Sequence, residues 1–250
     1  MSDAYVSTTI DNKIATIEFF HPSHNSLPGD ILSKLAQAIL DAGNNDEVAV
    51  IILRSGGDRT FCAGASFNEL IAIDNEQEGL EFFSGFARVI NACRSIPKLI
   101  IGRVQGKAVG GGVGVASAVD YCFATKFAAV KLSELHIGIG PFVVGPAVER
   151  KIGVSAMSQL AINANSFQSA EWAQDKGLYA SVHDSAEEMD GAIQELATQL
   201  AGYNPEAMKE LKRIFWEGTE HWDTLLFERA AVSGRLVLSE ETRTILAKYK

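Results

Sequence analysis

Residues 97–145 contain the groups with the clearest potential for chemistry. Three consecutive glycines, Gly110 to Gly112, follow an apolar run at 99–101 and precede a run of small residues of helical length at 113–119. A strand, a glycine turn and a helix in that order direct unpaired backbone N–H groups toward whatever lies above the turn. Glycine suits such a turn because it permits positive φ and close approach of a ligand. The segment therefore predicts a site for an anion, or for an oxygen that gains negative charge.

The known fingerprints for nucleotide phosphates do not fit this segment. A P-loop needs Lys and then Ser or Thr after its last glycine, whereas Gly111 is followed by Gly112 and Val113. A dinucleotide fingerprint beginning at Gly110 needs a glycine at 115, where the chain has Val115. Taken alone, the cluster is equally compatible with a tight turn.

Two further stretches make the pattern specific: TFCAGASFNEL at 60–70 and SELHIGIGP at 133–141. Together with the glycine run, they resemble the F-x-A-G-A-D-x-x-E-[LM], G-x-A-x-G-G-G-x-E and P-E-x-x-x-G-x-x-P motifs of the enoyl-CoA hydratase/isomerase family, also called the crotonase superfamily. The resemblance extends from about residue 10 nearly to the C-terminus. It implies an enzyme of acyl-CoA thioesters, as in fatty acid metabolism, with coenzyme A as part of the substrate and no separate cofactor or metal.

The resemblance also implies an oxyanion hole. In this family, the N–H of the second alanine of A-G-A and that of the middle glycine of G-G-G bind the thioester oxygen. The corresponding residues here are Ala65 and Gly111. An enolate formed from a thioester places negative charge on that oxygen, and loss of one donor typically lowers the rate by about 10²–10³.

Hydratases of the family use two glutamates, and only one of these positions is a carboxylate in this chain. The first position is Gly114, and the second, twenty residues later, is Glu134. A single acid/base can move a proton between two carbons of an enolisable thioester, which is double-bond isomerisation, whereas hydration must also activate a water. The sequence therefore favours isomerisation by Glu134, whose pKa would be raised by apolar neighbours, namely Leu132, Leu135, Ile137 and Ile139.

Other functions stay open. Hydration, decarboxylation or cleavage could proceed with water or the substrate in place of the lost carboxylate. A non-catalytic protein that binds acyl-CoA or an acyl carrier is also compatible with Gly114 and with Ser66, which replaces the usual Asp. Glu134 itself could be a helix cap or an ion-paired carboxylate instead of a base.

The resemblance implies further substrate contacts. The loop at 21–27 lies beside acyl-CoA in the family, so Ser23 and His24 are candidates, although a capped surface loop is an equal interpretation. Lys248 is the candidate cation for the CoA phosphates, because Asn68 replaces a frequent lysine. The other predicted contacts flank the motif residues: Ala63, Ser66, Phe67, Asn68, Gly110, Gly114, Pro141 and Phe142. Phe142 and the two following valines would narrow the acyl pocket.

Alternating apolar strands and helices predict an α/β fold. A hairpin is expected over 4–20 with its turn at Asn12, a buried strand at 48–53, and helices at 28–42, 69–95, 147–164 and 186–202. The resemblance implies the crotonase-like (ClpP/crotonase) spiral of ββα units, with a core at 1–195 and a C-terminal helical trimerisation region at 196–250, as one functional domain. Members of the family are commonly homotrimers or hexamers built as dimers of trimers.

Composition restricts the class of protein. The chain has 250 residues, 47% of them apolar, which suits one large domain. A net charge of −9 argues against a nucleic-acid partner. The three cysteines lack metal-binding spacing and are expected to be reduced core residues. With no signal sequence and no apolar run near the ~18 residues of a membrane span, we expect a cytoplasmic enzyme without a membrane partner.

Overall fold

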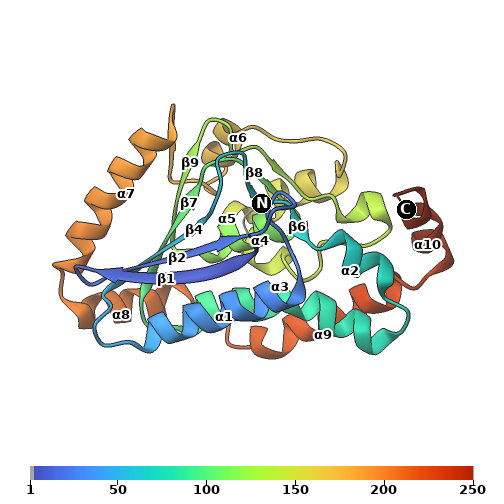
Figure 1. Cartoon of the computed structure of the whole chain (residues 1–250), viewed down its shortest axis with the longest axis horizontal. Helices are drawn as coiled ribbons and strands as arrows, with labels where there is room; N and C mark the ends of the chain where they lie inside the picture. The colour runs from blue at the N-terminus through green and yellow to red at the C-terminus, as the bar shows by residue number, and fades with distance from the viewer. Residues whose placement is uncertain (1–2, 250) are drawn as a thin grey trace.

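The computed structural model describes residues 3–249 and shows a six-stranded sheet between helices (Figure 1). The first two strands form an antiparallel hairpin, as predicted, with Asn12 and Lys13 at positive φ in its turn. All other neighbouring strands in this sheet are parallel. In spatial order the strands are β1 (Tyr5–Asp11), β2 (Ile14–Phe20), β4 (Val50–Ser55), β7 (Leu99–Val104), β9 (Tyr121–Thr125) and β11 (Ser181–His183).

Short strands form two smaller parallel sheets. One has the order β10 (Val130–Lys131), β8 (Lys107–Val109), β5 (Thr60–Cys62), and the other pairs β3 (Ser26–Leu27) with β6 (Gly64–Ala65). Each successive turn of the chain thus contributes a long strand to the large sheet, then a short strand, then a helix. This spiral of ββα units, followed by a helical C-terminal region, confirms the predicted fold class.

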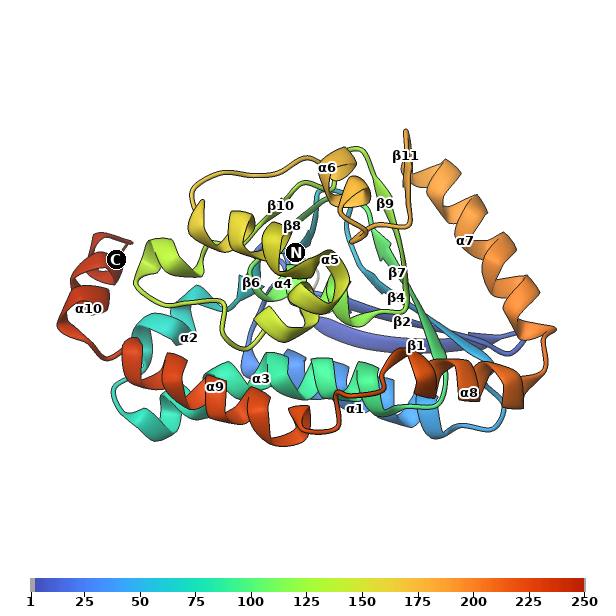
Figure 2. The same ribbon diagram turned by 180° about the vertical axis from the view of Figure 1, so that it is seen from behind.

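Helices cover both faces of the large sheet (Figures 1 and 2). On one face, α1 (Gly29–Asn44) and α3 (Glu76–Ser95) pack on alternate strand residues that include Ala15, Ile17, Ile51 and Leu53. On the other face, α7 (Ala186–Ala201) packs on the intervening residues, including Ile14, Val50, Ile52 and Ile101. Because both faces are covered, β4 and β7 read as continuous apolar runs in the sequence.

Two predicted helices are interrupted. The region 69–95 contains α2 (Phe67–Ala72) and α3, separated by residues 73–75, and Asn75 caps α3 by accepting a hydrogen bond from Glu78 N at 2.9 Å. The helix expected at 147–164 is α5 (Gly145–Ile162), with a kink at Gly153, whose φ is +74°. Two shorter helices, α4 (Gly111–Ala118) and α6 (Ala170–Asp175), complete the spiral.

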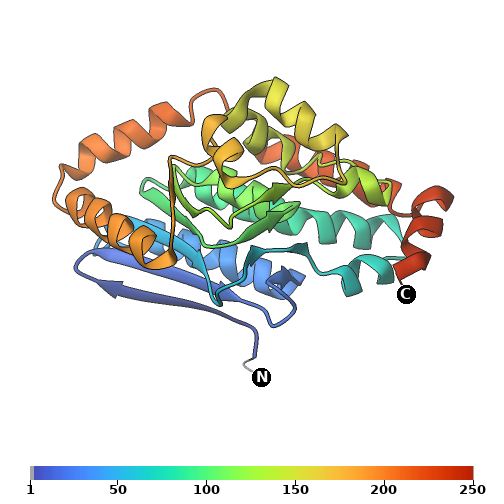
Figure 3. The same ribbon diagram turned by 90° about the horizontal axis from the view of Figure 1, so that it is seen from above.

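The C-terminal helices fold back onto the spiral (Figure 2). They are α8 (Pro205–Phe215), α9 (Trp222–Leu236) and α10 (Glu240–Leu246), followed by a 3-10 turn, η2 (Ala247–Tyr249). α9 crosses α3 so closely that a Cβ on Gly79 would lie 2.6 Å from Gly234 Cα. Figure 3 shows α10 at the end of the molecule opposite α7. The predicted boundary at residue 195 and the predicted role in trimerisation stay predictions.

Asp120 joins α8 to the large sheet. Its carboxylate accepts hydrogen bonds from Lys212 Nζ at 2.6 Å, Trp216 Nε1 at 2.9 Å and Ile100 N at 2.8 Å. Lys212 is only 2% exposed, so this is a buried ion pair that is fully supported by hydrogen bonds.

Helices long and apolar enough to cross a membrane do not occur within residues 3–249.

Candidate active site

The three segments singled out in the sequence follow three adjacent strands of one small sheet. Residues 63–65 follow β5, Gly110 follows β8, and Ser133 and Glu134 lie two and three residues after the end of β10. Because these strands are parallel, their carboxyl ends meet at one edge, the usual place for a ligand site in an α/β protein. The segments are also joined directly: Gly110 N donates to Lys131 O at 2.8 Å, and a Cβ on Gly64 would lie 3.7 Å from Gly111 N.

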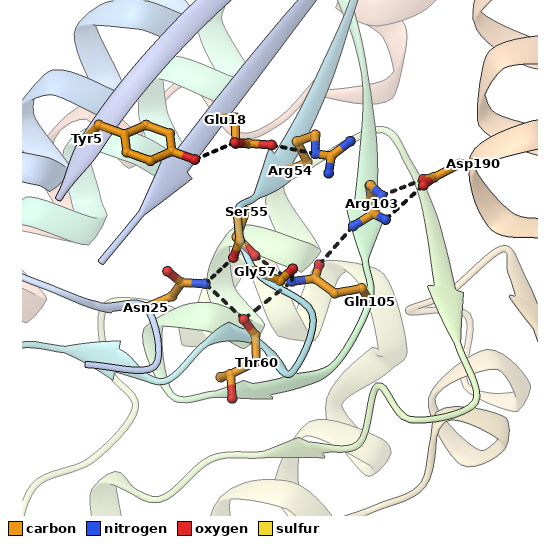
Figure 4. A network of polar contacts seen from close by, with 11 residues as sticks. Tyr5, Glu18, Asn25, Arg54, Ser55, Gly57, Thr60, Arg103, Gln105 and Asp190 are labelled. Carbon is orange, nitrogen blue, oxygen red and sulfur yellow. Dashed lines mark hydrogen bonds and ion pairs between the residues drawn. The ribbon is translucent and has the colours of Figure 1, made fainter. Parts of the chain in front are cut away.

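A buried polar network fixes the loop that leads into residues 63–65 (Figure 4). The Asn25 side-chain amide donates to Gly56 O at 3.0 Å and to Thr60 O at 2.9 Å, while its backbone carbonyl accepts from Ala63 N at 3.2 Å. Gln105 Nε2 reaches the same loop through Ser55 Oγ at 2.9 Å. Both amide side chains are less than 5% exposed, so the loop is anchored from inside the protein.

The glycine turn is a tight junction at which side chains do not fit. Gly110 has a φ of +53°, and a Cβ on it would lie 3.0 Å from Glu134 Oε1. A Cβ on Gly111 would lie 2.2 Å from the Phe86 ring, and one on Gly112 would lie 2.5 Å from Cys62 O. Gly111 is the first residue of α4, so its N–H has no carbonyl partner within that helix.

Glu134 opens a 3-10 helix, η1 (Glu134–Ile137), which Gly138 closes at a φ of +85°. Its carboxylate atom Oε2 is buried and has no hydrogen-bond partner. Burial raises the pKa of Glu134 from its ordinary 4.5 to about 7, against a smaller opposing effect of the backbone N–H groups of residues 134 and 133. A carboxylate with that pKa can both accept and return a proton near neutral pH.

The apolar setting predicted for Glu134 is present, with one exception. Ile137 and Ile139 line the same cavity as the carboxylate, and Leu132 is fully buried. Leu135 instead faces solvent with 53% of its surface exposed, because the short η1 turn points it outward.

The carboxylate and the glycine turn face one cavity of about 140 Å³. Eight of the residues singled out in the sequence line it: Ala63, Ala65, Phe67, Gly110, Gly111, Glu134, Pro141 and Phe142. The remaining wall comes largely from α3 and from the segment between η1 and α5. The structure thus brings the residues of the proposed oxyanion hole and the proposed base to the same cavity.

The other predicted substrate contacts lie outside this cavity. Ser23 and His24 are exposed in the loop before β3, Asn68 is exposed on α2, and Lys248 is exposed in η2. Ser66 caps α2 by accepting a hydrogen bond from Glu69 N at 3.3 Å. A role for these residues in contacting coenzyme A, most of which would lie outside the cavity, stays a prediction.

Gly114 is buried behind the cavity wall. A Cβ on this residue would lie 2.5 Å from Val144 Cγ1 and 2.8 Å from Val144 Cβ. The space that a glutamate would need at this position is therefore filled by Val144, which itself lines the cavity. Apolar atoms of Val144 therefore occupy the space in front of residue 114.

Ser233 on α9 also lines the cavity, and the sequence analysis did not find it. Its hydroxyl donates to Arg229 O at 3.3 Å within the same helix. The close crossing of Gly79 and Gly234 brings α9 to this position. In the sequence, Gly79 and Gly234 each stand inside a helical stretch, but nothing in the sequence indicates that these two glycines contact each other.

The cysteines take no visible part in the site chemistry. Cys62, Cys93 and Cys122 are buried free thiols, and burial raises the pKa of each to about 12. Residues 3–249 contain no cluster of three or more His, Cys, Asp and Glu side chains that could bind a metal ion.

Comparisons with known proteins agree with this architecture. The enoyl-CoA hydratase/isomerase family model matches residues 9–234. A peroxisomal Delta(3,5)-Delta(2,4)-dienoyl-CoA isomerase of Arabidopsis thaliana is 27% identical over 242 residues, covering 87% of this chain and 84% of the relative. A short-chain-enoyl-CoA hydratase of Clostridium acetobutylicum is also 27% identical, covering 96% and 92%. The crystal structure of enoyl-CoA hydratase from Bacillus halodurans superposes with a TM-score of 0.90 at 21% identity, over 98% of this chain and 99% of that one.

Proposed function

This chain belongs to the enoyl-CoA hydratase/isomerase family, and on that premise we propose that it shifts the double bond of an acyl-CoA thioester, with Glu134 as its single acid/base. The observation that carries the proposal is the occupation of the first of the two carboxylate positions, at residue 114. Gly114 has no side chain, and Val144 fills the space in front of it. Glu134 is the only ionisable side chain among the residues that line the cavity.

The first step forms a dienolate. With the thioester oxygen bound by the N–H groups of Ala65 and Gly111, the Glu134 carboxylate removes a proton from the α carbon of a β,γ-unsaturated acyl group. The electron pair of the broken C–H bond delocalises over the thioester carbonyl and the double bond. The two N–H groups stabilise the negative charge that develops on oxygen.

The second step returns the same proton to the γ carbon. The protonated Glu134 donates it, the double bond moves to the α,β position, and the carboxylate is regenerated. No atom is gained or lost, so one group suffices for the reaction. A pKa of about 7 suits both half-reactions, because the group is neither fully protonated nor too weak a base near neutral pH.

Hydration requires more than the cavity wall provides. A water has to be oriented and deprotonated on one side of the double bond while a proton is delivered to the other carbon. Apolar atoms of Val144 stand where the first glutamate of the hydratases would project, and the hydroxyls of Ser133 and Ser233 are the only uncharged polar side chains among the lining residues. This supports isomerisation over hydration.

The test is product analysis with two substrates supplied separately, a 3-enoyl-CoA and the matching 2-enoyl-CoA. Isomerisation converts the first into a product of equal mass, whereas hydration converts the second into a product heavier by one water. We expect turnover of the 3-enoyl-CoA that Glu134→Gln lowers at least about 10³-fold, since a glutamine cannot accept the proton. Glu228→Gln, an exposed carboxylate on α9, serves as the matched control and keeps wild-type turnover.

Two results would overturn the proposal. Formation of the 3-hydroxyacyl product as the main reaction would make the chain a hydratase that works with one carboxylate. Binding of CoA thioesters without turnover of any of them would make it an acyl-CoA binding protein.

A further inference from the structure

The wall of the cavity contains a restricted set of side chains. Five phenylalanines line it: Phe67, Phe82, Phe83, Phe86 and Phe142. Aliphatic side chains complete most of the remainder, and Glu134 is the only charged one. No Lys, Arg or His occurs among the described residues that line this space.

Arg229 is a cation that lies next to the cavity wall but outside the cavity. Arg229 lies one helical turn before Ser233 on α9, and its guanidinium donates to Phe142 O at 3.4 Å. That contact ties it to the backbone of the cavity wall, and Arg229 is not one of the lining residues. An acyl group in the cavity therefore meets aromatic and aliphatic surface, two hydroxyls and one carboxylate.

These properties decide which acyl groups can bind. A carboxylate buried without a cation or hydrogen-bond donors loses its hydration without compensation, and a second negative charge nearby adds repulsion. The volume sets a further limit, because a cavity of roughly 150 Å³ accommodates about one benzene ring, and this cavity measures about 140 Å³.

We infer that the substrate of this enzyme carries a short, uncharged acyl group of up to about six carbons, and that thioesters of dicarboxylic acids are excluded. This inference rests on the proposed acyl-CoA function and narrows it. The inference assigns selection of the acyl group to the aromatic side chains of the cavity wall. Among them is Phe142, which precedes the N-terminus of α5 and whose ring packs against Gly140.

The experiment compares three substrates that differ only at the end of the acyl chain. They are 3-pentenoyl-CoA, the analogue in which the terminal methyl is a carboxylate, and the analogue in which it is a carboxamide. The carboxamide matches the carboxylate in shape and lacks its charge. We expect kcat/KM for the carboxylate to fall at least about 100-fold below that for the methyl compound, with the carboxamide between them.

Chain length is tested with 3-hexenoyl-CoA and 3-dodecenoyl-CoA. The wild type is expected to prefer the shorter compound at least about tenfold, and Phe142→Ala is expected to reduce that preference by enlarging the cavity. Equal kcat/KM for the two lengths in the wild type would overturn the size limit.

A binding measurement separates failure of this inference from failure of the proposed function. Calorimetry of the wild type with saturated pentanoyl-CoA and with its terminal carboxylate analogue needs no turnover. Tighter binding of pentanoyl-CoA, by at least about tenfold, supports the inference even if no substrate is converted. Equal binding of the two, or equal rejection of the carboxylate and the carboxamide in the kinetic comparison, would overturn it.

Discussion

Replacing Glu134 by glutamine should make the protein more stable as well as inactive. The folded protein encloses this carboxyl group without a partner for Oε2, and burial raises its pKa from 4.5 to about 7. The difference corresponds to about 3 kcal/mol at 1.36 kcal/mol per pKa unit. Glutamine has nearly the same shape and carries no charge, so the variant does not bear this cost.

The difference in the free energy of unfolding between Glu134→Gln and the wild type depends on pH. Below about pH 4.5 the carboxyl is neutral in both the folded and the unfolded chain, and Glu134→Gln should leave the free energy of unfolding almost unchanged. Between pH 4.5 and about 7 the unfolded chain ionises first, so the wild type loses stability as the pH rises. Above about pH 8 the full difference of about 3 kcal/mol should favour the variant.

Urea unfolding at pH 5, 6, 7 and 8.5 measures this difference for the wild type, Glu134→Gln and the exposed control Glu228→Gln. The control should follow the wild type within about 0.5 kcal/mol at every pH. In parallel, wild-type kcat/KM should rise about tenfold per pH unit toward a plateau above about pH 7, because only the ionised carboxylate accepts a proton. A stability difference that does not change with pH would show that the carboxyl is not desolvated.

Further substitutions test, by urea unfolding, the packing at Gly114 and two buried polar networks. Gly114→Ala should destabilise by about 1–3 kcal/mol because its Cβ overlaps Val144, and Val144→Ala in the same chain should recover at least about 1 kcal/mol of that loss. Lys212→Met should destabilise by about 3–5 kcal/mol because it leaves the Asp120 carboxylate buried without its cation. Asn25→Gly allows the positive φ of that residue but removes its two side-chain hydrogen bonds, so it should lower the free energy of unfolding by about 2–3 kcal/mol. It should also lower kcat/KM more than it changes KM.

Each of these has a control or an outcome that contradicts it. Additive effects of the alanines at 114 and 144 would mean that the two side chains do not compete for one space. Lys209→Met, at an exposed lysine on the same helix as Lys212, should change stability by less than about 0.5 kcal/mol. Wild-type activity in Asn25→Gly would show that the network does not position the loop at 63–65.

The sequence was most informative where local periodicity and glycine spacing determine structure. The hairpin at β1 and β2 and the buried strands β4 and β7 follow from patterns confined to a few residues. The same holds for the junction of Gly110 and Gly111 with α4. The break between α2 and α3 was missed because the residues at 73–75 have no strong helix-terminating signal apart from Asn75.

The cavity wall was harder to predict because long-range packing forms it. Ser233 reaches the cavity because α3 and α9 cross at Gly79 and Gly234, two residues that are 155 positions apart in the sequence. The exposed position of Leu135 depends on the tight turn of η1, which apolar composition does not reveal. Motif residues are recognisable one by one, whereas the surface that selects an acyl group is assembled from several elements.

The two halves of the proposed chemistry differ in how firmly the fold fixes them. The oxyanion donors and the base follow the adjacent strands β5, β8 and β10, and the pairing of Lys131 with Val109 is locked by the bond from Gly110 N to Lys131 O. A slip of one residue along this ladder would move Glu134 by about 3.3 Å relative to Gly110, more than a proton transfer tolerates.

The strand pairing does not determine which residue stands at position 114, the other carboxylate position. Position 114 lies within α4, where a Cβ would lie 2.5 Å from Val144 Cγ1 and 3.6 Å from Ile90 Cδ1. In the proposed mechanism, exchange of a glutamate for glycine at this position, with an apolar residue opposite, would change the reaction without disturbing the ladder that positions the proposed oxyanion donors. The spiral can therefore keep one way of stabilising an enolate while the carboxylates around it determine where the proton goes.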